Sequence, residues 1–355
     1  MTSGRIVAPR AGMGLGMGLL QIQTFDPNRG FAFEDRPFII MTDHSEVDLG
    51  AVYNAAMSDD AVLAAVLAKD AKAAKAALDA GGGPDGKDKE GDPALHCAVA
   101  LKSKTLVKLL LERGANVHAT DAKGRTILHV LADDMPDASL GALAIDRGAK
   151  LDQLDRVNYE ERAPLHRAVM KKKLDFAEML VARGAAIDIA DGNDQLTPLH
   201  LVIKSKSGAM SASEEAAALW LLDRGADPNA VNDQQQNALH LAARTGSHTV
   251  LEALFARGAK ITCDKHGSEP LSYSLSTNEK DSWIWDLFLA KGCNLDHQDA
   301  RRQTPVMRAQ VHWNPTAVKY LLGRGADLSL RDEDGLTVLE RATKLGQPKI
   351  LPLLK

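Results

Sequence analysis

The sequence predicts an all-α solenoid of about nine stacked helix-turn-helix units, joined by hairpin loops and preceded by a non-repeat N-terminal segment. Two markers recur in one register. The first is a glycine followed by alanine or a close relative, every 33 to 41 residues, at Gly114, Gly148, Gly184, Gly225, Gly258, Gly292 and Gly325. The second is a histidine after leucine, at His96, His129, His166, His200 and His240. Two markers that keep the same phase predict a repeat architecture.

Each unit carries the start and stop signals of two helices. The tetrapeptide TPLH (197–200) begins with a threonine that suits an N-cap and a proline that suits the first helical turn. The second helix is apolar, as in TLVKLLLERGAN (105–116), and the glycine just past its end favours a left-handed C-cap. A polar stretch such as DAKGRT (121–126) follows and indicates a tight hairpin turn.

These motifs resemble the ankyrin repeat family. The resemblance rests on TPLH at 197–200, APLH at 163–166, TILH at 126–129 and the recurring RGA, and it covers residues 61–355. It implies stacked helix pairs, hairpin loops at about right angles to them and a concave inner face. We expect units near 61–88, 89–121, 122–157, 158–190, 191–231, 232–264, 265–298, 299–331 and 332–355, the last of them a capping unit.

Several segments depart from the repeat. The long finger 151–162 and the insertion 206–215 are expected to form loops, because insertions in solenoids map to loops. Residues 1–60 form a separate, partly flexible extension in this interpretation. Within it, two apolar runs in 30–41 favour a hairpin, and 45–57 has apolar residues near helical spacing and is expected to cap the array.

Composition and motifs narrow the classes of function that we expect for this protein. The net charge of −4 lacks the basic character of a nucleic-acid-binding protein, and no run of about 20 apolar residues indicates a membrane span. Cys97, Cys263 and Cys293 show no metal-ligand spacing, which favours free thiols in the cytoplasm and no cofactor. GxSxG and P-loop motifs are missing, so we expect no enzyme. Glycine-rich residues 11–20 leave secretion open as an alternative.

The family resemblance also implies roles for individual residues. The repeated histidine is expected to tie neighbouring turns together through hydrogen bonds. Hairpin tips and the ends of first helices are the variable surface positions of the family. Those positions hold Lys123, Arg125, Tyr159, Arg162, Met170, Lys171, Lys204 and Arg244, which we expect to face solvent. Six of the eight are cationic, so they predict a docking surface for an acidic segment of another protein.

The tryptophans predict a second docking surface. Trp220 and Trp285 align with apolar positions of the second unit and are expected in the core. Trp283 and Trp313 align with Thr105 and Lys102, which are polar, and exposed aromatic residues commonly anchor interfaces.

The sequence thus predicts a protein-binding scaffold or adaptor that is monomeric on its own and uses its concave groove and hairpin tips. Two alternatives stay open. One is an inhibitor or immunity-type protein that blocks a toxin or an enzyme. The other is a secreted effector whose N-terminal segment directs it to a host cell.

Overall fold

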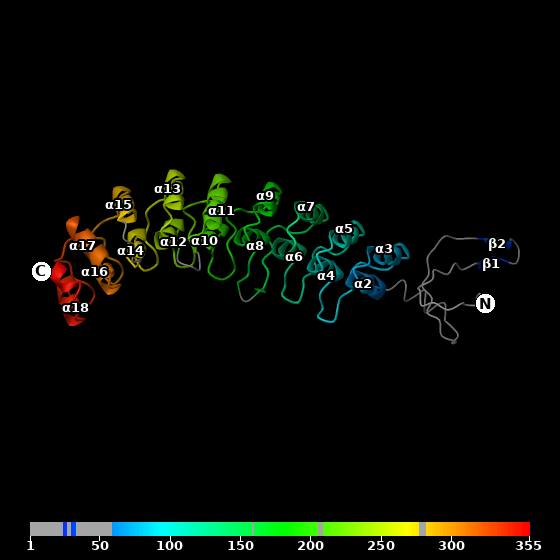
Figure 1. Ribbon diagram of the computed structural model, residues 1–355, viewed down its shortest axis with the longest axis horizontal. Coiled ribbons are helices and arrows are strands. Elements are labelled where there is room, and N and C mark those ends of the chain that lie inside the picture. Colours follow the sequence, from blue (N-terminus) through cyan, green and yellow to red (C-terminus); the bar gives the residue numbers. More distant parts are fainter. Residues whose placement is uncertain (1–23, 27–29, 33–58, 158–159, 205–208, 277–281) are drawn as a thin grey trace.

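A computed structural model describes residues 24–26, 30–32, 59–157, 160–204, 209–276 and 282–355 (Figure 1). These residues contain seventeen α-helices, which pack as consecutive pairs. The first helices of the pairs are α2 (Asp59–Leu67), α4 (Ala94–Ala100), α6 (Ile127–Asp134), α8 (Pro164–Met170), α10 (Pro198–Ile203), α12 (Ala238–Thr245), α14 (Pro270–Ser274), α16 (Pro305–Val311) and α18 (Val338–Lys344). The second helices are α3 (Ala71–Asp79), α5 (Lys104–Glu112), α7 (Ala138–Asp146), α9 (Leu174–Ala182), α11 (Ala212–Asp223), α13 (His248–Ala256), α15 (Trp283–Ala290) and α17 (Pro315–Gly323).

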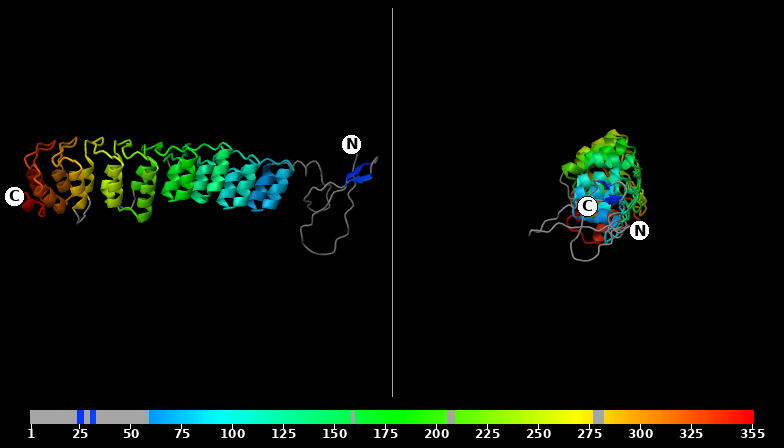
Figure 2. Two further views of the ribbon diagram at one scale, coloured as in Figure 1. Left: turned by 90° about the horizontal axis from the view of Figure 1, so that it is seen from above. Right: turned by 90° about the vertical axis from the view of Figure 1, so that its right-hand side faces the viewer.

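The pairs stack side by side into one curved array, as the predicted solenoid requires. First helices form one row and second helices form the other, and the second helices lie on the convex side (Figure 1). The hairpin loops run along one edge of the array (Figure 2). The last unit differs from expectation, because α18 is followed by a short 3₁₀ helix, η2 (Leu351–Leu353), instead of a second α-helix. Pro352 lies inside that segment and cannot donate an α-helical hydrogen bond.

Outside the repeats, strand β1 (Thr24–Asp26) pairs antiparallel with β2 (Gly30–Ala32), and Phe25 lies opposite Phe31. The expected hairpin within 30–41 is therefore misplaced, because residues 30–32 pair backwards along the chain. The rest of that segment and the expected helix at 45–57 lie outside the described residues.

Local signals begin and end the helices where the motifs indicate. The Thr197 hydroxyl accepts a hydrogen bond from the His200 amide, and Pro198 occupies the first turn of α10. Second helices end before a glycine such as Gly114, whose φ is +84°. A Cβ added to Gly114 would meet no atom within 4 Å, so glycine is favoured there by its backbone conformation and not by space.

The expected loop at 206–215 is partly helical. Residues 205–208 lie outside the described residues, but Ser211 caps α11 and Glu214 completes a capping box with it. The insertion therefore lengthens the second helix to 12 residues instead of forming only a loop.

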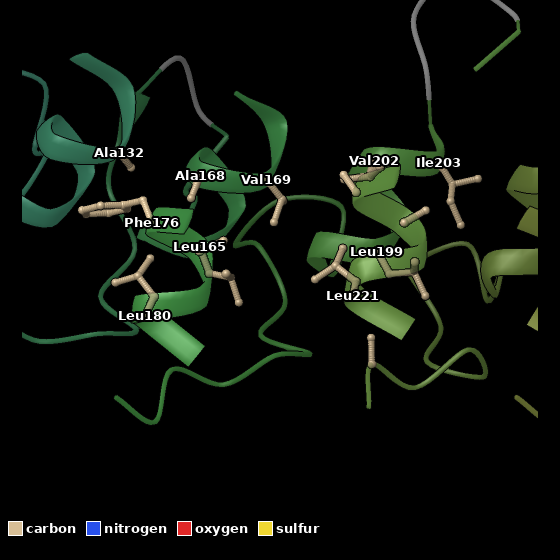
Figure 3. Close-up of a cluster of buried hydrophobic side chains, with 14 of the residues drawn as sticks. Ala132, Leu165, Ala168, Val169, Phe176, Leu180, Leu199, Val202, Ile203 and Leu221 are labelled. Carbon is tan, nitrogen blue, oxygen red and sulfur yellow. The ribbon is translucent and has the colours of Figure 1, made fainter. Parts of the chain in front are cut away.

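A single apolar cluster runs from Val62 to Leu354 through every unit. Figure 3 shows part of it, where Leu165 of α8, Phe176 of α9 and Leu199 of α10 are all buried. No unit could bury its apolar face alone, so stacking supplies the core. The hairpins are held by a carboxylate or amide whose oxygen accepts backbone N–H groups of the same turn. These residues are Asp88, Asp121, Asp155, Asp191, Asn232, Asp264, Asp299 and Asp332.

Candidate protein-binding face

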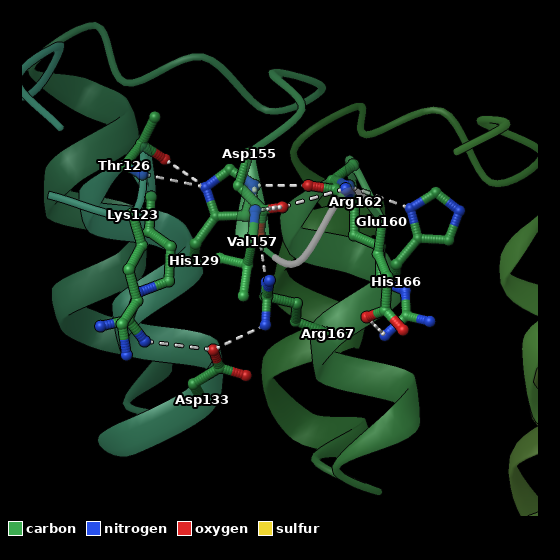
Figure 4. Close-up of polar contacts among 12 residues, drawn as sticks. Lys123, Thr126, His129, Asp133, Asp155, Val157, Glu160, Arg162, His166 and Arg167 are labelled. Carbon is green, nitrogen blue, oxygen red and sulfur yellow. Dashed lines mark hydrogen bonds and ion pairs between the residues drawn. The ribbon is translucent and has the colours of Figure 1, made fainter. Parts of the chain in front are cut away.

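Four of the five repeated histidines, His96, His129, His166 and His240, join their first helix to the next hairpin. Nδ1 of His166 accepts the Ala163 amide at 3.0 Å, and Nε2 contacts the carbonyl oxygen of Leu196 in the following unit at 3.0 Å. Because Nδ1 accepts, Nε2 carries the proton and donates it. His129 makes the same pair of contacts, with the Thr126 amide at 3.1 Å and the Arg162 carbonyl at 2.8 Å (Figure 4). The predicted hydrogen bonds between turns are present.

Burial keeps these histidines neutral. It lowers the pKa of His129, His166 and His200 to about 4, and it lowers the pKa of His96 and His240 as well. His96 and His200 are the exceptions in geometry. Pro93 takes the place of the amide donor at His96, whose Nδ1 is buried without a hydrogen-bond partner. Nδ1 of His200 accepts the Thr197 amide at 3.2 Å, but its Nε2 is buried without a hydrogen-bond partner. The histidines thus position the hairpins and are not free for acid–base chemistry.

Next to these histidines, two arginines of the concave face are bound in a carboxylate cluster (Figure 4). Nε of Arg125 lies 2.7 Å from Asp121, and its Nη1 lies 3.4 Å from Asp133 at the end of α6. Nη1 of Arg167 from the next unit lies 3.0 Å from the same Asp133, and its Nε contacts the fully buried Asp155. Arginine pairing holds the pKa of Asp155 below its usual value in spite of burial.

The structure corrects the expectation that all the predicted cations face solvent. The side chain of Arg125 is only 19% exposed, and that of Arg162 is 12% exposed with Nη1 at 2.6 Å from Glu160. Both arginines form ion pairs inside the fold. Arg125 pairs with Asp121 of its own hairpin and Asp133 of α6, and Arg162 pairs with Glu160 of its own hairpin. Lys204 is exposed but lies 3.2 Å from Asp194, and Met170 is half-buried. Tyr159 lies outside the described residues.

Three of the predicted cations are exposed and form no ion pair with any described residue: Lys123, Lys171 and Arg244. Lys171 directly follows α8, Lys204 directly follows α10, and Arg244 lies in the last turn of α12. These three helices are consecutive neighbours in the row of first helices. We call Lys171, Lys204 and Arg244 the basic edge. Each cation also stands at the negative end of a helix dipole, which favours it there.

Two of the four tryptophans differ from the prediction in how far they are buried. Trp285 is buried in the core as expected. Trp220 is not fully buried, because it lies between helices α9 and α11, where its indole N–H donates to Glu178 and Arg224 stacks over its ring. Trp283 is half-buried with its ring 4.7 Å from that of His248, so it already has a packing partner. Only Trp313 among the four is largely exposed, at 57%.

No group of three histidine, cysteine or carboxylate side chains suited to a metal occurs among the described residues. In the same part of the chain, no helix is long and apolar enough to cross a membrane. A shallow hollow of about 600 Å³ lies between second helices, lined by Lys75, Lys108 and Asp137 among others, and contains no histidine or cysteine.

Comparison with known proteins agrees with the architecture. Family models described as ankyrin repeats in many copies, in three copies and as a single repeat match residues 206–255, residues 61–137 with 275–355, and residues 160–192. The chain is 29% identical to the nuclear factor NF-kappa-B p105 subunit of Gallus gallus over 46% of its own length. It is 30% identical to the ankyrin repeat protein nuc-2 of Neurospora crassa over 56%, and 28% identical to the E3 ubiquitin-protein ligase KEG of Arabidopsis thaliana over 70%.

These matches cover 16%, 18% and 15% of the three relatives, so the likeness spans only a small part of each of them. The matched segments coincide with the stacked helix pairs between α2 and η2. With its repeated motifs, its histidine contacts and these matches, the chain belongs to the ankyrin repeat family.

Proposed function

We propose that this protein is a binding scaffold that holds an acidic segment of another protein on its concave face, along the basic edge and the neighbouring hairpin tips. Ankyrin repeats generally serve protein–protein interaction. The observation that carries the proposal is the basic edge itself, which places three exposed cations on three consecutive helices of a chain with a net charge of −4. Neither Lys171 nor Arg244 is needed for an ion pair with a described residue of the fold.

The expected interface is broad and is not catalytic. A stable protein complex buries about 800 Å² on each partner, which several adjacent units supply and one hairpin does not. Cations in a row steer an acidic partner to the face and raise its association rate. The buried histidines are occupied by hairpin contacts, so the proposed role is binding alone. An inhibitor that blocks an enzyme or toxin would use the same face, and the identity of the captured partner distinguishes it from an adaptor.

The test is charge reversal of the basic edge. We expect the triple variant Lys171→Glu, Lys204→Glu and Arg244→Glu to lose partner capture in affinity purification with mass spectrometry from the source cells. All three side chains are exposed, so each change should alter the free energy of unfolding by less than about 0.5 kcal/mol. Association should slow and lose its salt dependence if these cations act by steering.

A matched control makes the same change of charge on second helices. Lys72 and Lys75 of α3 and Lys319 of α17 are exposed and form no ion pair with described residues. Their reversal to glutamate should leave capture intact. Equal capture by the basic-edge variant and the wild-type chain would refute the proposed face.

A further inference from the structure

Trp313 occupies a backbone position that is costly for a bulky residue. It lies in the turn between α16 and α17 with a φ of +55°, the left-handed region. The same turn of other units holds Lys69, Lys102 and Lys172, with φ values of 56–57°, or a glycine, Gly246 and Gly346. Left-handed backbone costs a residue with a Cβ about 1–2 kcal/mol, and the position is most unusual for a bulky side chain.

Among the described residues, no packing in the apolar core offsets this cost. Trp220, Trp283 and Trp285 pack in or against the apolar core, whereas Trp313 does not belong to that cluster and is 57% exposed. Lysine occupies the same turn in three other units, so the turn itself does not require an aromatic ring. Strained and exposed residues that the fold does not need are typical of binding positions.

Further apolar side chains lie beside Trp313. Val311 ends α16 and is 37% exposed, and Leu345 follows α18 and is 50% exposed. The two turns are adjacent, because Gln310 Nε2 donates to Gln347 Oε1 at 2.5 Å and Gln347 Nε2 donates to the Gln310 carbonyl at 3.0 Å. Val311 and Trp313 on one turn and Leu345 on the other are therefore exposed apolar side chains on two neighbouring turns.

Arg308 supplies an anion-binding group on the same helix as Val311. It lies three residues before Val311, one helical turn away on the same face of α16. Arg167 and Arg341 hold the equivalent position of other units, and each pairs with the carboxylate of its own hairpin, Asp155 and Asp332.

Arg308 has no such pair among the described residues. Its own hairpin carboxylate, Asp299, accepts the Arg301 and Gln303 amides, as Asp155 and Asp332 accept amides of their own turns, but Asp299 forms no ion pair with Arg308. Arg308 is half-buried, and its Nε is buried with no hydrogen-bond partner. A partly desolvated guanidinium without a partner favours a carboxylate, which it binds with two parallel hydrogen bonds. The exposed Lys344 at the end of α18, next to Leu345, adds a further positive charge at this end of the array.

We propose that Arg308, Val311, Trp313, Lys344 and Leu345 form a second docking surface, the C-terminal patch, for an extended segment of a partner protein that carries alternating acidic and apolar residues. A carboxylate of that segment pairs with Arg308, and an apolar side chain rests on Trp313. This inference deepens the proposed binding function and rests on it.

The probe is a fluorescein-labelled twelve-residue peptide in which glutamate and leucine alternate at every second position, with serine between them. Binding to the full chain is followed by fluorescence polarisation. We expect saturable binding, at least a tenfold rise in Kd for Trp313→Lys, and a similar rise for Arg308→Gln. Trp313→Lys restores the residue that the turn carries in three other units, so this variant should fold. Peptides with serine for leucine, or lysine for glutamate, should not bind.

Other outcomes separate this surface from the basic edge. Peptide binding that Trp313→Lys and Arg308→Gln leave unchanged, but that the basic-edge variant abolishes, overturns the C-terminal patch and leaves the proposed function standing. The C-terminal patch is also overturned, and the proposed function stands, if the peptide does not bind the chain at all but the basic-edge variant loses partner capture. Self-association of the chain in analytical ultracentrifugation that disappears in Trp313→Lys would make a second copy the occupant and overturn the acidic partner.

Discussion

At the scale of single residues, cationic side chains serve two opposite purposes on the concave face. Arg125 lies among Asp121, Asp133 and Asp134. Its guanidinium is mostly buried and paired with these carboxylates, so its charge serves the fold. Lys123 lies two residues earlier on the same hairpin, and its ammonium has no ion pair with a described residue. Sequence position alone does not separate them, because both belong to the hairpin tip that varies in ankyrin repeats. The carboxylates on α6 make the difference.

This contrast predicts different costs for the same substitution. Arg125→Glu would place a fourth carboxylate among three, and we expect a loss of about 3 kcal/mol or more in the free energy of unfolding. Lys123→Glu should change it by less than about 0.5 kcal/mol. Urea denaturation followed by circular dichroism measures both values. Similar stabilities for the two variants would show that the carboxylate cluster does not hold Arg125 in solution.

At the scale of elements, arginines that precede the glycine after a second helix link second helices across units. Arg113 contacts Asp79 at 2.6 Å, and Arg183 contacts Asp146 at 2.5 Å, each one unit back along the chain. Arg257 contacts Asp223 in the same way at 2.5 Å. The side chains are largely exposed, so each pair contributes about 0–1 kcal/mol. The recurring RGA motif therefore combines a helix stop with a contact between neighbours.

Much of the element structure could be predicted from the sequence. Helix starts at TPLH and stops at RGA are local signals, and the 33-residue period aligns them, so the helix pairs and the histidine contacts followed. The prediction for the insertion before α11 failed for a local physical reason. Ser211 with Glu214 forms a capping box that extends α11 into an insertion we expected to be a loop. A local cap outweighed the general rule that insertions form loops.

The binding face was harder to predict, because exposure depends on partners from other parts of the chain. Asp133 binds Arg125 eight residues before it and Arg167 in the next unit, and no spacing rule reveals that shared carboxylate. Arg308 is the converse case. Its equivalents Arg167 and Arg341 are paired, and only the three-dimensional arrangement distinguishes it from them.

At the scale of the whole molecule, the buried histidines make stability depend on pH. His129, His166 and His200 keep a pKa of about 4 when folded but return to about 6.5 when unfolded, so the unfolded chain binds more protons between these values. Their contribution is complete above pH 6.5 and is lost as the pH falls towards 4. At pH 5 the loss is about 2 kcal/mol for each histidine.

Urea unfolding at pH 7.5, 6.0 and 5.0 checks this expectation. The free energy of unfolding should fall steadily over the range, and calorimetry in buffers of different ionisation enthalpy should detect proton uptake on unfolding. A free energy that does not change between pH 7.5 and 5.0 would mean that the histidines are not buried as neutral hairpin contacts.

The central claim is that a partner protein docks on the concave face, and hydrogen–deuterium exchange of the captured complex tests it most directly. The account predicts slower exchange at the C-terminal ends of α8, α10 and α12, around Lys171, Lys204 and Arg244, with little change along second helices such as α9 and α13. Protection confined to the second helices, with the ends of the first helices exchanging as fast as in the free chain, would contradict it.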